Sequence, residues 1–187
     1  MFKMRFSTIS VAVAILAFVA MPARAADEIE ASLEVCSSCH GQNGQPINAT
    51  IPTIWGQQAS YLMKQLHDYK SKDRNSAVMA AFVETIKQPD LRKVANYFAA
   101  KPWPAPPAAN ASAAPPNGMA TCRICHQENF QGGAPAPRLA GQSYEYLLAA
   151  MNSFANDERE NSADMMTLMK ALTASQREAM AKYLSAL

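Results

Sequence analysis

Hydrophobic residues recur along this chain at the spacing of a helix, and no segment alternates hydrophobic and polar positions as a half-buried strand does. Three sets of apolar residues each fall on one helical face: Tyr61, Leu62, Leu66 and Tyr69; Leu91, Val94, Ala95 and Phe98; and Tyr146, Leu147, Ala150, Met151 and Phe154. The segment Thr173-Ala174-Ser175-Gln176 resembles a capping box at the start of a last helix. The pattern predicts an all-α protein.

The pattern also occurs twice, which predicts two tandem helical domains. Cys36-Ser37-Ser38-Cys39-His40 recurs 86 positions later as Cys122-Arg123-Ile124-Cys125-His126, and the segment 52–57 recurs 85 positions later at 137–142. We therefore expect one domain over residues 26–100 and a second over 117–187. The linker between them, 101–116, is rich in Pro and Ala, which favours an extended, semi-rigid spacer. Trp103 is expected to pin this linker to a domain surface.

The N-terminus has the features of a secretory signal. Lys3 and Arg5 precede an almost wholly apolar run from Ile9 to Ala20, and small residues follow at 23–25. The run is shorter than the roughly 20 residues that a spanning helix needs. We therefore expect a signal peptide over residues 1–25, cleaved after Ala25, and a soluble periplasmic protein. An uncleaved membrane anchor is the alternative.

Net charge and domain size limit the classes of function that this protein can have. The formal net charge is +2, and removing residues 1–25 deletes three basic residues and no acids, which leaves −1. This balance excludes the basic surface typical of a nucleic-acid-binding protein. Each half has only about 75 residues, and helices around so small an aliphatic core are marginally stable by themselves. Each half is therefore expected to fold around a bound group.

All four cysteines lie in the two Cys-x-x-Cys-His motifs, the signature of covalent c-type haem attachment. A helical turn places two thiols beside the two vinyl groups of one porphyrin, and the adjacent imidazole then lies under the iron. Two other readings are weaker: a thiol–disulfide motif needs a βαβ context, and a four-cysteine zinc site leaves both histidines unexplained. Export by itself would favour disulfides. The repeated motif predicts two haem c groups, on Cys36 and Cys39 and on Cys122 and Cys125.

A methionine occupies the same place in both repeats and is the candidate for the far side of each iron. Met79 lies 39 residues after His40, and Met165 lies 39 residues after His126. Met166 is the rival of Met165. Paired His and Met ligands are typical of electron carriers of raised potential. The other methionines on helical stretches are expected to be packing residues: Met63, Met151, Met169 and Met180.

These motifs together resemble the dihaem cytochrome c4 family, over nearly all of residues 27–187. The resemblance implies two class I cytochrome c domains related by a pseudo-twofold axis, with His40 and Met79 on the first iron and His126 and Met165 on the second. It also implies that Pro52 and Pro137 accept a hydrogen bond from the proximal imidazole. Trp55 and the segment 87–90 depart from the family pattern, and the linker is longer than the family leads one to expect.

The resemblance further implies a periplasmic electron carrier, not an enzyme. Its donor would be a quinol-oxidising complex or a dehydrogenase, and its acceptor a haem–copper terminal oxidase. We expect a monomer and leave peripheral association with a membrane open. The alternatives are a dihaem redox subunit of a dehydrogenase complex, or an enzyme such as a peroxidase or thiosulfate-oxidising cytochrome.

Three further features carry weaker expectations. His67 is expected at the surface and not at a third metal site. Arg74 and Arg159 occupy equivalent places, and either pair with haem propionates or are solvated surface residues. Two clusters of opposite charge, Lys70, Lys72 and Arg74 in the first half and Asp157, Glu158 and Glu160 in the second, would give the molecule a dipole that orients it toward its partners.

Overall fold

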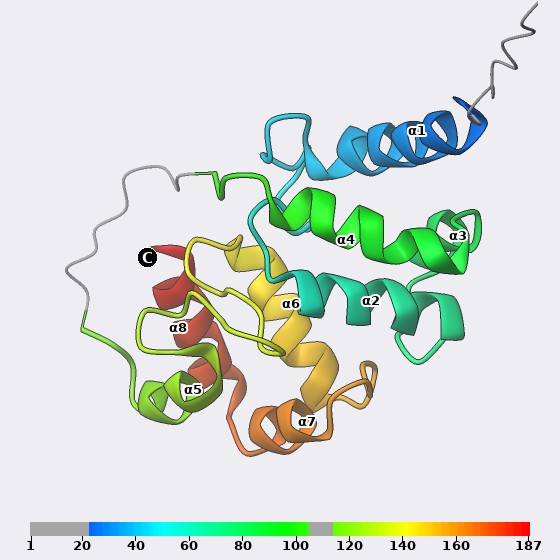
Figure 1. Ribbon diagram of the computed structural model, residues 1–187. Coiled ribbons are helices and arrows are strands. Elements are labelled where there is room, and N and C mark those ends of the chain that lie inside the picture. The colour runs from blue at the N-terminus through cyan, green and yellow to red at the C-terminus, as the bar shows by residue number, and fades with distance from the viewer. Residues whose placement is uncertain (1–22, 105–113) are drawn as a thin grey trace, which may run out of the picture.

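The computed structural model describes residues 23–104 and 114–187. The predicted signal segment lies almost wholly outside the described residues, as does the central part of the predicted linker, 105–113. Every regular element in the described part is helical, and none of these helices is long and apolar enough to cross a membrane. The prediction of an all-α protein with two similar halves is confirmed (Figure 1).

The two halves contain the same elements in the same order. The first contains α1 (Ala23–His40), α2 (Ala59–Ser71), α3 (Ala77–Glu84), a 3₁₀ turn (Gln88–Asp90) and α4 (Leu91–Ala99). The second contains α5 (Met119–His126), α6 (Tyr144–Ala155), α7 (Ala163–Lys170) and α8 (Ala174–Ser185). In the first half α2 packs against α3 and α4, and in the second α6 packs against α7 and α8. The halves lie side by side, with α2 and α6 between their outer helices (Figure 1).

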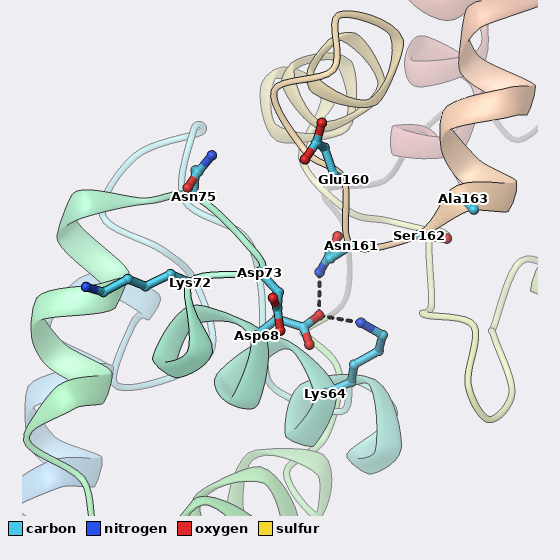
Figure 2. Close-up of a pocket in the computed structure, with 9 residues that line it drawn as sticks. All are labelled: Lys64, Asp68, Lys72, Asp73, Asn75, Glu160, Asn161, Ser162 and Ala163. Atoms are coloured by element: carbon cyan, nitrogen blue, oxygen red, sulfur yellow. Dashed lines mark hydrogen bonds and ion pairs between the residues drawn. The ribbon is translucent and has the colours of Figure 1, made fainter.

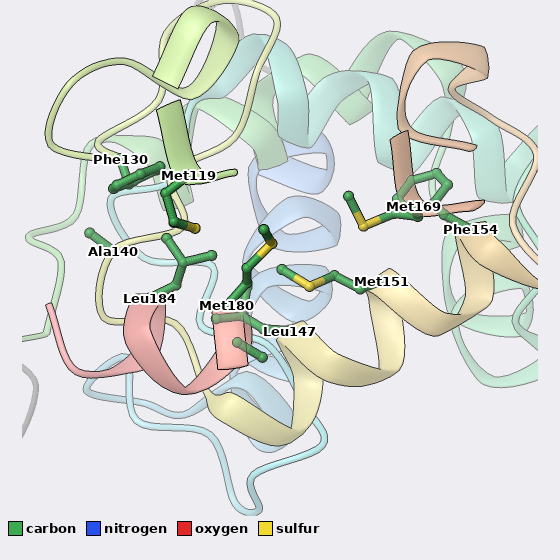
Figure 3. Packing of buried hydrophobic residues seen from close by; sticks show 10 residues of the cluster. Met119, Phe130, Ala140, Leu147, Met151, Phe154, Met169, Met180 and Leu184 are labelled. Atoms are coloured by element: carbon green, nitrogen blue, oxygen red, sulfur yellow. The ribbon is translucent and has the colours of Figure 1, made fainter. Parts of the chain in front are cut away.

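Each half has its own hydrophobic core. In the first, the four apolar residues predicted for one face of α4 are all buried, together with Leu62, Tyr69, Val83 and Ile86. In the second, residues from α5 to α8 interdigitate, and three of the predicted packing methionines, Met151, Met169 and Met180, are buried among them (Figure 3). Flexible methionines fill irregular interior space well. Because each half has a separate core, the contacts between the halves are additional to those that form the cores.

A side chain caps the N-terminus of α3, α6, α7 and α8. Thr173 and Gln176 form the capping box predicted for α8, with the Thr173 hydroxyl accepting from the Gln176 N–H and the Gln176 side chain accepting from the Thr173 N–H. Helix α4 has no such cap, because the departing segment 87–90 forms the 3₁₀ turn with Pro89 near its start. The two equivalent helices therefore begin by different means.

Gly56 joins the segment after the first cysteine motif to the end of α4. Its N–H donates to the carbonyl of Phe98 at 2.9 Å, and the equivalent Gly141 donates to Leu184 at 3.0 Å. Gly56 has φ +65°, and a Cβ there would lie 2.7 Å from the backbone nitrogen of Trp103. The linker thus passes directly over Gly56. The Trp103 ring stacks under the Arg138 guanidinium of the second half at 4.6 Å, which agrees with the predicted pinning role.

Candidate haem sites

Both cysteine motifs occupy the last turn of a helix, α1 in the first half and α5 in the second. All four cysteines are free thiols, and Cys36 and Cys122 pack against the core of their own half. Burial raises the pKa of the Cys36 thiol to about 11 and also raises the pKa of Cys122. A redox-active Cys-x-x-Cys motif needs the opposite shift. The geometry favours attachment of a group over thiol–disulfide chemistry.

The two motif histidines are held in the same orientation. His40 Nδ1 donates to the Pro52 carbonyl at 2.8 Å, and His126 Nδ1 donates to the Pro137 carbonyl at 2.8 Å. Burial lowers the pKa of both imidazoles, against the opposing effect of these hydrogen bonds. A neutral ring with its proton on Nδ1 leaves the Nε2 lone pair available to a metal. Both rings therefore have the tautomer and the orientation of an iron ligand.

Met79 and Met165 occupy matching positions near the starts of α3 and α7. Each is half-buried and packs against the core of its own half. Ser76 caps α3 and accepts a hydrogen bond from the Met79 N–H at 3.3 Å, and Ser162 caps α7 and accepts from the Met165 N–H at 3.5 Å. The sequence reasoning missed these serines, although Ser-x-x-Met occurs at the same place in both repeats. Met166 is also half-buried against the second core.

Large apolar side chains are exposed on the elements that carry the candidate ligands. Val35 on α1 is 44% exposed, Val78 on α3 is 64% exposed and Ile124 on α5 is 80% exposed. Phe82 and Leu168, on α3 and α7, are also exposed. These side chains lie on the same helices as the motif cysteines or the candidate methionines. A porphyrin attached beside each motif would cover apolar surface on these helices, so the residues present fit the predicted group.

Two arginines converge on one amide oxygen at the interface between the halves. Arg74 Nη1 donates to Gln65 Oε1 at 2.7 Å, and Arg159 Nη2 donates to the same oxygen at 2.9 Å. Each also reaches a tyrosine of the other half: Arg74 donates to Tyr146 at 3.2 Å and Arg159 to Tyr61 at 3.2 Å. Arg159 is only 7% exposed. The alternative of solvated surface arginines is wrong, because the partner half covers them.

This arginine pair has an excess of positive charge. Among the side chains that the structure describes, those of residues 28–104 and 114–187, no carboxylate lies within ion-pairing distance of either guanidinium. Burial raises the pKa of Tyr146, but the charges of Arg74 and Arg159 outweigh it and lower that pKa to about 8. Buried cations are normally paired with anions. The cluster thus favours a negatively charged group nearby, and the propionates of a haem have that charge.

Arg159→Ala is expected to loosen the two halves. The change removes hydrogen bonds to Tyr61 and Gln65, and a hydrogen bond to a charged group contributes about 1.5–3 kcal/mol. We expect the free energy of unfolding to fall by about 3 kcal/mol and the unfolding transition to separate into two steps, as followed by circular dichroism in denaturant. Arg92→Ala, at an exposed position on α4, is the control and should retain the wild-type transition. A variant as stable as wild type would contradict the role of Arg159.

A polar groove runs between the end of α2 and the segment before α7 (Figure 2). Asp68 accepts hydrogen bonds from Lys64 and, at 2.6 Å, from Asn161 Nδ2. Asp68, Asp73 and His67 bring ligand atoms within 4.8 Å of one another. Asp68 and Asp73 are already hydrogen-bonded, the latter to Ser71, and His67 is exposed as predicted. The polar side chains that line this groove therefore serve as contacts between the two halves.

The predicted basic cluster is wrong as a surface feature. The Lys70 ammonium donates to three carbonyls at the end of α3, those of Val83 and Glu84 in its last turn and of Ile86 just beyond it, at 2.7–3.2 Å. Arg74 is turned into the interface, so Lys72 is the only one of the three that is exposed. In the acidic cluster, Asp157 pairs with Lys170 at 2.5 Å. These three charges are neighbours in the sequence, but carbonyls at the end of α3 bind Lys70, and Arg74 binds Tyr146 of the second half.

Comparison with known proteins relates both halves of the chain to cytochromes c. The family model of cytochrome c matches twice, at residues 28–102 and 117–187. The chain is 31% identical to cytochrome c-552 of Acidithiobacillus ferridurans over 81% of this chain and 73% of that one. It is 29% identical to cytochrome c4 of Pseudomonas aeruginosa over 78% of each chain.

Solved structures show the same arrangement of two halves. The cytochrome c4 structure from Acidithiobacillus ferrooxidans superposes with a TM-score of 0.68 at 28% identity, covering 82% of this chain and 99% of that one. A further relative, the thiosulfate dehydrogenase electron acceptor of Stutzerimonas stutzeri, is 28% identical over 79% of this chain and 76% of its own. The similarity therefore extends over both repeats and is not confined to the cysteine motifs.

Proposed function

Because this chain belongs to the dihaem cytochrome c4 family, which carries two covalent haem c groups, we propose that it is an exported carrier that accepts and donates single electrons in the periplasm. One observation carries the proposal most directly. In each half a Cys-x-x-Cys-His turn ends a helix, and its histidine is oriented by a proline carbonyl 2.8 Å away. That arrangement is suited to an iron ligand beside a covalently attached porphyrin.

The ligand assignment is part of the proposal. Cys36 and Cys39 would attach the first haem and Cys122 and Cys125 the second. His40 with Met79 would ligate the first iron, and His126 with Met165 the second. Support comes from the repetition of each feature, including the serine cap before each methionine. The domains of the proposal are residues 26–100 and 117–187, with the linker 101–116 between them. Cleavage after Ala25 would release the mature protein.

The residues around each site favour electron transfer without chemistry on a substrate. When bound, each haem supplies a one-electron iron couple. The proline carbonyls keep the imidazole protons on Nδ1. Met79 and Met165, both half-buried, would supply the second iron ligand and so close the site to a substrate. Arg74 and Arg159 place positive charge at the interface, where they would neutralise haem propionates. A site held in this way changes little between oxidation states.

The partners we propose follow from the family and its relatives. The donor is a quinol-oxidising complex or a dehydrogenase, and the acceptor is a haem–copper terminal oxidase. The relative named as an electron acceptor of thiosulfate dehydrogenase supports a dehydrogenase as donor. We propose a monomer that binds these partners in turn. Peripheral association with the membrane is compatible with this proposal.

A redox titration combined with turnover tests this function. The purified holoprotein should show two low-spin haems, each with the charge-transfer band of a Met-to-iron bond. Added to purified donor complex and oxidase, it should be reduced and reoxidised within the turnover time of the oxidase. A high-spin ferric fraction at rest, or tight binding of carbon monoxide or peroxide, would instead support an enzyme such as a dihaem peroxidase. A permanent complex on size-exclusion chromatography of a native extract would support a dehydrogenase subunit.

A further inference from the structure

Two buried glutamines cross the interface between the halves and grip the same backbone position in the opposite half. Gln142 Oε1 accepts from the Thr53 N–H at 3.0 Å, and its Nε2 donates to the Thr53 carbonyl at 2.9 Å. Gln57 accepts from the Arg138 N–H at 2.7 Å and donates to the Arg138 carbonyl at 3.0 Å. Gln57 is 4% exposed and Gln142 is 3% exposed. We call this reciprocal pair the glutamine clamp.

The clamped residues directly follow the prolines that orient the histidines. The Thr53 N–H and the Pro52 carbonyl belong to one peptide group. On one side this group donates to Gln142 Oε1 at 3.0 Å, and on the other it accepts from His40 Nδ1 at 2.8 Å. The peptide group between Pro137 and Arg138 is placed in the same way between Gln57 and His126. A continuous hydrogen-bond chain therefore runs from a side chain of each half to the proximal histidine of the other.

We propose that the glutamine clamp is a positioning and tuning device: each half sets the basicity of the proximal histidine in the other half, and so the reduction potential of its haem. The inference rests on the proposed axial roles of His40 and His126. An acceptor on the peptide N–H polarises the amide and makes its carbonyl oxygen a stronger acceptor for the imidazole N–H. A stronger bond at Nδ1 raises the basicity of the iron ligand, which favours the ferric state and lowers the potential.

Burial makes this chain effective and separates it from an ordinary surface contact. Both bonds between Gln142 and Thr53 are buried, and hydrogen bonds in a low-dielectric interior are electrostatically stronger than in water. Each glutamine oxygen also accepts from the N–H of the next residue in its own chain, at 3.0 Å from Ser143 and 2.9 Å from Gln58. These local bonds fix the amide orientation, so the clamp does not rotate freely.

The test is a crossed pair of substitutions in the full-length holoprotein. Gln142→Met removes the acceptor and should raise the potential of the first haem only, and Gln57→Met should raise that of the second haem only. We expect a two- to tenfold change in the ratio of reduced to oxidised haem at fixed ambient potential, or about 20–60 mV at 59 mV per tenfold for one electron. Spectroelectrochemical titration measures both potentials, and paramagnetic NMR assigns each to its half.

Two further variants separate tuning from loss of structure. Gln142→Glu keeps an acceptor oxygen opposite the Thr53 N–H, and should give a first-haem potential at or below that of wild type. Gln58→Ala removes another interdomain bond, from Gln58 Nε2 to the Gln131 carbonyl at 3.1 Å, without touching either prolyl peptide, and should shift neither haem. In the reduced protein, the His40 Nδ1 proton should resonate upfield in Gln142→Met, as a weaker hydrogen bond requires.

The outcomes are distinguishable. A shift in the crossed haem alone, with a raised potential in Gln142→Met and no rise in Gln142→Glu, supports the clamp. Equal shifts of both haems, a shift in the haem of the same half, or no shift at all would overturn the clamp while leaving the ligand assignment intact. If the wild-type spectra lacked histidine–methionine ligation at either iron, the proposed function would fail, and the role of the clamp at that iron with it.

Discussion

Met79→Ala is expected to lower the reduction potential of the first haem by on the order of 100 mV, within the roughly 0.8 V over which axial ligands set haem potentials. A thioether on the far side of the iron favours the reduced state, and its loss leaves the position to water or to nothing. Met165→Ala should have the same effect on the second haem. Spectroelectrochemical titration should show one potential displaced and the other retained, with the Met-to-iron band reduced by half.

Matched variants separate ligation from packing. Met79 packs against the first core, so Met79→Leu keeps most of the apolar volume and should still lose the ligand signal. Met63→Ala removes a methionine that contacts the same core and should leave both potentials unchanged. Met166→Ala distinguishes the two candidates in α7: only the true ligand gives the displaced potential. Low-spin, unshifted haems in both Met79→Ala and Met165→Ala would mean that the ligand assignment is wrong.

Cys36→Ser combined with Cys39→Ser is expected to yield a protein with one haem and a destabilised first half. A group that binds only the folded state stabilises it, and a half of this size is only marginally stable without such a group. We expect a loss on the order of 5 kcal/mol in the first half, which is comparable with the whole stability of a small domain. The mass of the mature protein should fall by one haem, and circular dichroism should lose signal from the helices α1 to α4.

The reciprocal variant provides the control for this prediction. Cys122→Ser combined with Cys125→Ser should lose the second haem and destabilise α5 to α8, while the first half keeps its spectrum. Both variants retain the histidines and the methionines, so any change traces to covalent attachment. Recovery of two bound haems from either variant, in a host competent in haem attachment, would show that the motif cysteines are not the attachment points.

The helices were largely predictable because their signals are local. The apolar spacing of Leu91, Val94, Ala95 and Phe98 describes α4, and all four residues are buried. The capping box of α8 was readable from four consecutive residues. The serine caps of α3 and α7 were as readable, since Ser76 and Ser162 precede their methionines by the same three residues. They were missed because a serine before a helix is common and acquires meaning only when the repeat is aligned at that position.

The interface was not predictable from the same signals. Gln65 and Asp68 lie on α2 among residues that read as a polar helix face, yet both are buried. Their partners in the second half, Arg159 and Asn161, lie 93 or more positions away. In a single sequence, a glutamine that will be buried in an interface cannot be distinguished from one that will be solvated, because the side chain is the same. The same holds for Arg74 and Arg159, because each binds a tyrosine of the opposite half that is distant in the sequence.

The sequence alone determined the helical class, the duplication and the candidate residues for attaching and ligating two haems, because these depend on short-range spacing and on side-chain chemistry. Only the tertiary structure showed which polar groups of one half form hydrogen bonds with the other half. The glutamine clamp and the arginine pair join polar groups from opposite repeats, and their energies come from burial that neither half provides by itself. Local pattern specifies how a helix presents its residues, whereas the docking of two surfaces depends on their whole shapes.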